Sequence, residues 1–312
     1  MNVVVSGGTG FIGRALCRSL VRQGMSVTVL SRNPLQARAG LDSAIKVVEW
    51  DGMTSGIWET ELASAAAVMN LAGAPIAEGR WTQKRKQFIV DSRVNATRLL
   101  AQAMARCSNG PRVLISASGI GFYGTSHDRL FDERNGAGSD FFADLCQAWE
   151  EAALAAQSAG VRVVCLRIGM VLEQDGGALA KMVPPFRAFV GGPIAPGTQW
   201  LSWIHRADLI GLIEWALTNS KVSGPVNAVA PGPVTMKEFC KALGKVLNRP
   251  SWLPVPGFAL RLAFGELASF MTTGQRVLPK VALDGGYQFR YPQLDSALRS
   301  FFMRTPASEV RP

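Results

Sequence analysis

In the first half of the chain, short hydrophobic runs alternate with segments in which hydrophobic residues recur at helical spacing. This pattern predicts alternating strands and helices. Val3 to Val5 form a β-branched run, and apolar positions recur at helical spacing from Phe11 to Gln23. Five further apolar runs predict strands over residues 26–30, 45–49, 66–70, 113–118 and 161–166. Longer helices are expected over residues 81–107 and 141–158. This order predicts the α/β class, as a Rossmann-type doubly wound parallel sheet.

A glycine-rich turn joins the first strand to the first helix. Its sequence, SGGTGFIG, satisfies both G-x-G-x-x-G and G-x-x-G-x-x-G, so the motif leaves the glycine register open. Such glycines let backbone N–H groups approach a pyrophosphate at the helix N-terminus, where the helix dipole favours negative charge. An ordinary glycine turn is the alternative. The predicted dinucleotide contacts here are Gly7, Thr9, Gly10, Phe11, Ile12 and Gly13.

The end of the second strand indicates which dinucleotide is bound. An acidic residue there would accept hydrogen bonds from the adenosine ribose, as in an NAD site, but this chain has Ser31 and Arg32. A hydroxyl and a guanidinium suit a 2′-phosphate, so we expect NADP in preference to NAD. Asp51, after the third strand, is expected either to accept from the adenine amino group or to stabilise an exposed turn.

Residues just past the C-terminal ends of parallel strands line the ligand crevice of such a sheet. After the fourth strand these are Leu71, Ala72 and Gly73, and after the sixth they are Gly169 and Val171. We include them in the predicted cofactor site. Arg93, on the helix after the fourth strand, is also assigned to it.

The last third of the chain predicts a separate unit. Prolines separate two segments of helical periodicity, over residues 235–247 and 258–270. We predict an NAD(P)-binding Rossmann domain and a smaller, mainly helical, substrate-side C-terminal domain. The first is assigned residues 1–170 with 203–230, and the second 171–202 with 231–305. Four aromatic residues are expected in the core, with a position in a pocket as the alternative: Phe186, Trp200, Phe258 and Phe264.

Composition restricts the partners. The 33 basic and 23 acidic residues give a net charge of +10, but the densest basic cluster, residues 80–86, lacks a series of stacking aromatics. We therefore expect a solvated helix face and no nucleic-acid partner. The two histidines have no metal-ligand spacing, so no metal is predicted, and the five dispersed cysteines are expected to be reduced thiols.

The same composition restricts location. We find no run of eighteen apolar residues, so no membrane partner is expected. The chain enters its first strand at Asn2, which leaves no room for a signal peptide and predicts a cytoplasmic protein. A small-molecule substrate is the expected partner, and homo-oligomerisation is left open.

Six motifs together resemble the extended short-chain dehydrogenase/reductase superfamily: SGGTGFIG, NLAGAP, SRVNATRLL, SASGIGFYG, DFFADLCQAWE and RIGMVLEQDGGAL. The C-terminal run, which includes VAPGPVTMKEFCKALGKVLNRP and GQRVLPKVALDGGYQFRYP, resembles the YfcH-like epimerase branch of atypical members. The resemblance covers nearly the whole chain. It implies an NADP-dependent oxidoreductase or an epimerase-like enzyme acting on a small molecule.

The superfamily transfers protons with a Tyr-x-x-x-Lys pair and a nearby Ser. In this chain the matching positions hold Phe142, Cys146 and Gly119. The resemblance therefore implies that the usual mechanism is absent. Tyr123 and Ser118 are the candidate catalytic replacements, although Tyr123 is alternatively a packing aromatic, and Cys146 is expected to be a buried helical cysteine. A catalytically silent NADP-binding sensor or interaction protein is the alternative function.

The segment GGPIAPGTQWLSWIHRAD resembles the one with which nucleotide-sugar relatives hold a diphosphate. Those relatives have an arginine two residues after the glutamine, whereas Gln199 is followed there by Leu201, so a nucleotide-sugar substrate is not implied. Anion contacts from elsewhere are open to Arg187, Arg276 or Arg290. His205 and Asp208 are expected to fix a helix start.

Overall fold

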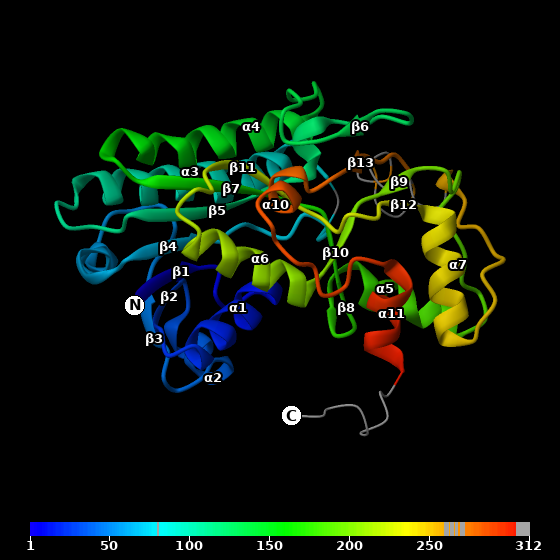
Figure 1. Ribbon diagram of the computed structural model, residues 1–312, viewed down its shortest axis with the longest axis horizontal. Coiled ribbons are helices and arrows are strands. Elements are labelled where there is room, and N and C mark those ends of the chain that lie inside the picture. The colour runs from blue at the N-terminus through cyan, green and yellow to red at the C-terminus, as the bar shows by residue number, and fades with distance from the viewer. Residues whose placement is uncertain (80, 259–261, 263–264, 266–267, 269–271, 304–312) are drawn as a thin grey trace.

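The structure, a computed structural model, describes residues 1–79, 81–258, 262, 265, 268 and 272–303. In this part of the chain, seven parallel strands form one sheet in the order β11-β7-β5-β4-β1-β2-β3 (Figure 1). The strands are β1 (Asn2–Ser6), β2 (Ser26–Ser31), β3 (Lys46–Glu49), β4 (Ala67–Asn70), β5 (Val113–Gly119), β7 (Arg162–Ile168) and β11 (Gly224–Ala228). The order reverses between β1 and β4, where a doubly wound sheet opens its ligand crevice. The predicted Rossmann-type parallel sheet is confirmed.

The continuous apolar run of β1 is explained by burial on both faces. Val3 and Val5 point into one hydrophobic cluster, while Val4 points into another on the opposite face. The first cluster lies under α1 (Phe11–Arg22) and α6 (Arg206–Thr218), and the second lies under α3 (Gln83–Arg106). Figure 1 shows α1 and α6 on one side of the sheet, and α3 and α4 (Phe141–Leu154) on the other.

Helix boundaries follow from capping. Thr82 accepts from the amide of Arg85, so α3 begins at Gln83, two residues after the predicted start. Asp140 caps α4, whose predicted continuation to residue 158 is instead a short 3₁₀ helix over Ala155–Ala159. The helix predicted over 235–247 is α7 (Met236–Leu247), and Thr235 and Glu238 form a capping box at its start.

The helices on the right of Figure 1 pack around a third hydrophobic cluster. Trp203, Phe186 and Phe239 are among its fully buried side chains. The helices around it are α5 (Gly177–Arg187), α7 and α11 (Leu294–Phe302). Short strands connect them in two pairs, β8 (Met170–Glu173) with β10 (Trp203–His205) and β9 (Trp200–Leu201) with β12 (Val234–Thr235).

The elements α2 (Pro34–Gly40), η1 (Ile57–Ser64), η2 (Ile120–Tyr123), β6 (Leu130–Phe131), β13 (Arg276–Val277) and α10 (Lys280–Asp284) complete the described fold. β6 pairs with β13, which brings the C-terminal segment beside the loop after β5. No helix among the described residues is long and apolar enough to cross a membrane. The domain boundaries stay a prediction.

The four aromatic residues expected in the core differ in burial. Phe186 is buried and Trp200 is half-buried, whereas Phe258 is 76% exposed, so the core prediction was wrong for Phe258. Apolar character alone does not decide burial, because folded surfaces also carry apolar side chains. Phe264 and most of the helix predicted over 258–270 lie outside the described residues.

Candidate functional site

The glycine turn after β1 is packed too closely for side chains. Gly7 has φ of +72°, and a β-carbon there would lie 2.6 Å from the carbonyl carbon of Leu71. A β-carbon on Gly13 would lie 2.2 Å from the carbonyl oxygen of Gly7, which also accepts from the amide of Gly10 at 3.0 Å. Gly8 is instead pressed against Val29 of β2. These contacts give Gly7, Gly10 and Gly13 the backbone roles of the motif.

Helix α1 begins directly at this turn with its first amides uncapped by any side chain. Gly10 occupies the N-cap position and makes no side-chain cap hydrogen bond. The twelve-residue helix therefore presents N–H groups and the positive end of its dipole toward the C-terminal edge of the sheet. This arrangement suits a phosphate group.

The predicted contacts from distant segments meet around this helix start. The ring of Phe11 lies against the Gly176–Gly177 turn, where a β-carbon on Gly176 would lie 2.6 Å from it. Arg206 covers the ring with its guanidinium at 5.1 Å and forms an ion pair with Glu173. Ile12, Leu71 and Val171, all partly buried, pack against one hydrophobic cluster.

Gly169 has a structural reason to be glycine. A β-carbon there would lie 2.6 Å from the carbonyl oxygen of Ser202 and 2.7 Å from Val229. The close approach of Ser202 and Val229 therefore excludes a side chain at position 169, whether or not a ligand binds nearby.

The end of β2 carries an exposed cation. Ser31 accepts from the amide of Asn33 at 3.2 Å, and Arg32 is exposed and, within the described chain, has no ion-pair partner. Arg14, which sequence reasoning missed, donates from Nε to the carbonyl of Thr9 at 2.8 Å, and its guanidinium lies beside Gly40. The sequence did carry a hint of it: Arg14 is a basic residue near the start of α1, where the helix dipole favours acidic side chains.

Asp51 stabilises its own turn. Its carboxylate accepts from the amides of Met53 (2.7 Å) and Thr54 (2.9 Å) and from the Thr54 hydroxyl (2.8 Å). These hydrogen bonds hold the pKa of the carboxyl below its usual range. The turn alternative thus accounts for Asp51, and a contact with adenine stays a prediction.

A buried polar network, missed from the sequence, ties the strand ends together at the point where the sheet order reverses. Asn70, the last residue of β4, accepts from Ser6 at 2.7 Å and donates to Thr97 (2.7 Å) and Ser116 (3.1 Å). Trp149 donates to the same Thr97 hydroxyl at 2.9 Å. The network fixes β1, β4 and β5 against α3 and α4.

Arg93 lies behind the turn that follows β4. It is 7% exposed and donates to the carbonyls of Ile89 (3.1 Å) and Ala74 (2.9 Å). A β-carbon on Gly73 would lie 2.9 Å from its Cζ, so only glycine leaves room for the guanidinium. Its Cζ also lies 5.2 Å from the Trp149 ring, and burial lowers the pKa of Arg93 to about 10.

The positions of the missing catalytic groups are filled by packing. Phe142 is buried and contacts Trp81, with the two ring centroids 5.1 Å apart. Cys146 is a buried free thiol, as expected, and burial raises its pKa to about 11. Gly119 has extended backbone, and a β-carbon there would meet Cys146 Sγ at an ordinary 3.6 Å. Neither α4 position offers an ionised group at neutral pH.

The two candidate hydroxyls belong to one buried hydrogen-bonded chain. Ser118 donates to Glu150 at 2.7 Å, and Glu150 forms two hydrogen bonds with Arg167, at 2.8 and 2.9 Å. Arg167 donates to the Tyr123 hydroxyl at 3.0 Å, which itself donates to Asn227 at 2.7 Å. Burial raises the pKa of Tyr123 to about 12. The packing alternative accounts for Tyr123, and catalysis by either hydroxyl stays a prediction.

Glu133 extends this series of buried hydrogen bonds to the C-terminal segment. Its carboxylate accepts from the amides of Asn227 (2.9 Å), Lys280 (3.1 Å) and Val281 (3.2 Å). Burial raises the pKa of this carboxyl, while the three amides oppose the change. The loop after β5, strand β11 and helix α10 are therefore joined at one point.

His205 and Asp208 fix the start of α6, as expected. Nδ1 of His205 accepts from the amide of Ala207 at 2.9 Å, and burial lowers the pKa of the imidazole to about 4. Asp208 accepts from the amides of Arg290 and Tyr291, so it also holds the segment before α11.

The other predicted anion contacts are dispersed. Arg187 ends α5, Arg276 lies in β13 over the Trp200 ring, and Arg290 precedes α11. Gln199 is buried and donates to the carbonyl of Ile194. Among the described residues, none of these three guanidinium groups contacts another.

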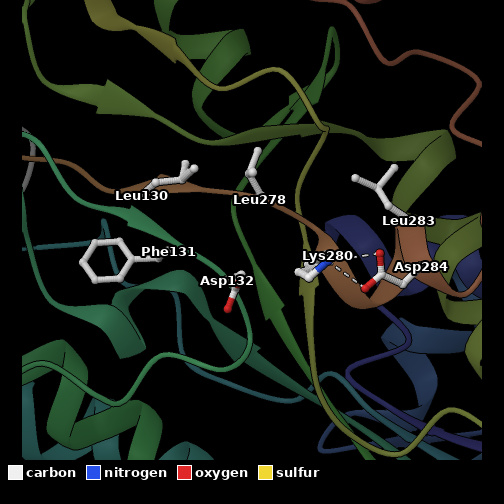
Figure 2. A pocket seen from close by; sticks show the side chains of 7 residues that line it. All are labelled: Leu130, Phe131, Asp132, Leu278, Lys280, Leu283 and Asp284. Carbon is white, nitrogen blue, oxygen red and sulfur yellow. Dashed lines mark hydrogen bonds and ion pairs between the residues drawn. The ribbon is translucent and has the colours of Figure 1, made fainter.

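A pocket of about 190 Å³ lies beside Tyr123, since the Phe131 ring in its lining stacks on the Tyr123 ring with the centroids 5.1 Å apart (Figure 2). It is lined by Leu130, Phe131, Asp132, Leu278, Lys280, Leu283 and Asp284. None of these belongs to the predicted site. Figure 2 shows Lys280 turned toward Asp284, with which it forms an ion pair at 2.9 Å.

Comparison with known proteins covers both halves of the chain. Residues 3–229 match the NAD dependent epimerase/dehydratase family, and residues 255–301 match a domain of unknown function, DUF1731. Epimerase family protein YfhF of Bacillus subtilis is 42% identical over 300 residues, covering 96% of this chain and 97% of that protein. The Arabidopsis thaliana protein named "Epimerase family protein SDR39U1 homolog, chloroplastic" is 42% identical over 305 residues, covering 96% and 86%.

A solved structure is also similar along its whole length. The crystal structure of human epimerase family protein SDR39U1 (isoform 2) with NADPH has a TM-score of 0.85 and 34% identity, covering 96% of this chain and 99% of that chain. The Arabidopsis relative is described as chloroplastic, so the cytoplasmic location expected for this chain stays a prediction.

Proposed function

Because the chain belongs to the NAD dependent epimerase/dehydratase family, as its motifs predicted, we propose that it binds NADP(H) and acts on a small molecule beside it. The observation that carries the proposal is the glycine turn, which is packed too closely for a β-carbon at Gly7 or Gly13 and leads directly into the uncapped start of α1. The similar human protein was crystallised with NADPH, which supports the same cofactor here.

The residues present fit such a cofactor. The uncapped amides after Gly10 would hold the pyrophosphate, and Ser31 with Arg32 would hold the 2′-phosphate. Leu71, Ala72 and Gly73 would lie along the cofactor, since they follow β4 directly and Leu71 touches the glycine turn. Asp51 and Val171 are retained as proposed contacts at the two ends of this site.

NADPH, when bound, supplies a hydride at C4 of its nicotinamide. The chain must then place a proton donor near the substrate oxygen; Phe142 has no ionisable proton, and Cys146 is a buried thiol on α4. We propose Ser118 ahead of Tyr123 for this role. Ser118 precedes Gly119 and hydrogen-bonds the Glu150 carboxylate, whereas the Tyr123 hydroxyl is held between Arg167 and Asn227. The single hydroxyl proton of Ser118 is held by Glu150, so Ser118 would turn that proton from the carboxylate to the substrate oxygen and act there as the hydrogen-bond donor.

Isotope transfer tests this function. Full-length protein is incubated with NADPH deuterated on one or the other face of C4, together with a panel of carbonyl compounds and sugars. We expect stereospecific transfer of one label into a product, detected by mass spectrometry. Ser118→Ala should lower the transfer rate by about 100-fold, while Ser158→Ala, at an exposed serine, should leave it unchanged.

A second function is favoured by the packing of α4. Phe142, Cys146 and Gly119 together remove the usual catalytic groups, which suits a cofactor-binding sensor. Tight NADPH binding with no label transfer to any compound in the panel would contradict the enzyme proposal and support the sensor. Absence of NADPH binding would contradict both.

A further inference from the structure

The side chain of Phe11 is held by residues from outside the glycine turn. Phe11 is the first residue of α1, and it is half-buried. A β-carbon on Gly176 would lie 2.6 Å from the ring carbons Cδ2 and Cε2, and one on Gly177 would lie 3.4 Å from Cε1. The guanidinium carbon of Arg206 lies 5.1 Å from the ring centroid. The turn between β8 and α5 and the start of α6 therefore meet on this one ring.

The position of Arg206 is explained by its two partners. Arg206 is the first residue of α6, where the positive end of the helix dipole disfavours a cation. An ion pair with Glu173, at 2.8 Å, and the face of the Phe11 ring offset this cost. The two charged side chains are only 24% and 15% exposed, so salt screens them less than it screens a surface pair. Glu173 also forms a backbone bridge with Gly176, so the carboxylate and the glycine beside the ring belong to one turn.

The position of Phe11 affects where the first free amides of α1 point. Gly10 caps the helix without any side-chain hydrogen bond, and its own amide already donates to the carbonyl of Gly7. The amides that follow begin at Phe11, and they are the ones proposed to hold the pyrophosphate. Side chains locked by packing keep such groups in a productive geometry. A displacement of the Phe11 ring would therefore move these amides.

We propose that Phe11, Glu173, Gly176, Gly177 and Arg206 form a clamp, in which Glu173 and Arg206 are positioning residues for the cofactor. The Phe11 clamp holds the first amide of α1 in place and so raises the affinity for the pyrophosphate. This rests on the proposed function, because the dinucleotide must bind at the glycine turn. Arg206 acts through Phe11 and not as a phosphate ligand, since Glu173 and the ring already engage its guanidinium. Glu173, Gly176 and Gly177 belong to the segment predicted for the substrate-side domain, so that segment takes part in the cofactor site.

NADPH and NADH are matched probes, because both contain the pyrophosphate and only NADPH carries the 2′-phosphate. Each is titrated by calorimetry into the full-length native protein and into each variant. We expect Arg206→Met to weaken both cofactors by the same factor, at least about fivefold. Glu173→Gln should weaken both by at least about threefold, because it releases Arg206. Arg206→Lys, which keeps a cation, should lie between Arg206→Met and the native protein.

Gly176→Ala tests the clamp without removing a charge. Its β-carbon would displace the Phe11 ring, so both cofactors should again bind at least about fivefold more weakly. This variant remains informative if Arg206→Met does not fold.

Lys46→Met is the charge control. Lys46 forms an ion pair with Glu61 at 2.8 Å and is the first residue of β3, at the edge of the sheet opposite the crevice. Lys46→Met and Arg206→Met should each shift the midpoint of urea denaturation by less than about 0.5 M. Only Arg206→Met should change cofactor affinity, which separates positioning from a general loss of stability.

Unchanged affinity for both cofactors in Arg206→Met and Gly176→Ala would overturn the proposal. So would tighter binding in Glu173→Gln together with weaker binding in Arg206→Met, which would make Arg206 a direct phosphate ligand. A changed ratio of NADPH to NADH affinity in these variants would place their effect at the 2′-phosphate and would also contradict the clamp. Failure of the proposed function is distinct: the native protein would bind neither cofactor, and the clamp would fall with it.

Discussion

At the α1 end of the crevice, backbone packing excludes side chains, whereas at the α4 end side chains fill the places where ionisable groups would stand. Gly7 and Gly13 lie so close to neighbouring backbone that a β-carbon has no room. Phe142 and Cys146 are instead buried in contacts that many apolar residues could make. At the α1 end, close backbone packing requires glycine whatever the protein does. At the α4 end, only the catalytic reaction required particular residues, so packing residues can replace them. A motif therefore transfers cofactor binding between relatives more safely than it transfers a reaction.

The two buried arginines show the same contrast in charge. Arg167 is matched by Glu150, and Arg93 by no carboxylate in the described chain. The first pair belongs to the fold of the α4 end, and the second guanidinium holds the turn after β4 through neutral carbonyls. The following predictions test this division, beginning with the largest expected effect.

Removing the Arg167 counter-ion should cost the most stability. Glu150→Ala leaves a buried guanidinium unpaired and should lower the free energy of unfolding by about 3–5 kcal/mol, measured by urea denaturation. Glu151→Ala, at the neighbouring exposed position, is the control and should change little. Equal losses in the two variants would show that the pair does not hold this end together.

The Cys146 thiol should be nearly inert in the folded protein. Its pKa of about 11 leaves fewer than about one thiol in a thousand ionised at pH 8. Alkylation by iodoacetamide, followed by peptide mass spectrometry, should be at least about 100-fold slower at Cys146 than at the half-buried Cys107. The rate at Cys146 should rise with pH until the pKa is passed. Rapid labelling of Cys146 in native protein would mean that the α4 end retains a reactive group.

A side chain at Gly13 should damage the α1 end. Gly13→Ala forces a β-carbon toward the carbonyl of Gly7, and we expect a loss of about 2 kcal/mol in unfolding free energy. NADPH affinity should fall at least about tenfold, because the turn must open. Gly136→Ala, where a β-carbon meets nothing within 4 Å, is the matched control. Unchanged affinity in Gly13→Ala would remove the glycine turn from the cofactor site.

Removing the Tyr123 hydroxyl should have the smallest effect. Tyr123→Phe deletes one acceptor for Arg167 and one donor to Asn227, which should cost about 1 kcal/mol in unfolding free energy. Label transfer from deuterated NADPH should change by less than about threefold if the hydroxyl is structural. A fall of about 100-fold at unchanged NADPH affinity would instead make Tyr123 a catalytic residue.

The central strands were predictable because they are buried on both faces. A short run of consecutive β-branched residues such as Val3 to Val5 is typical of an interior strand of a parallel sheet, which is buried on both faces. The pairs β8–β10, β9–β12 and β6–β13 were not predicted. Their strands have two to four residues, too few to show a period, and their partners lie at least about 30 residues away.

The site was predictable where backbone conformation limits the residue type, as in the glycine turn. The buried polar groups were not. Glu150 lies in a quoted motif, but nothing local shows that Arg167, on the next strand, is its partner. Glu133 accepts from amides 94 to 148 residues away, and its role appears only after the chain has folded. That Arg93 has no counter-ion among the described residues is likewise visible only in three dimensions.

The cofactor preference tests the central claim most directly. NADPH and NADH are titrated by calorimetry into the native protein, into Arg32→Asp and into Arg18→Asp, an equal charge change on the exposed face of α1. We predict that the native protein and Arg18→Asp bind NADPH at least about tenfold more tightly than NADH, and that Arg32→Asp abolishes this preference. Equal affinity of the native protein for the two cofactors, or an equal loss of both in Arg32→Asp, would contradict the account.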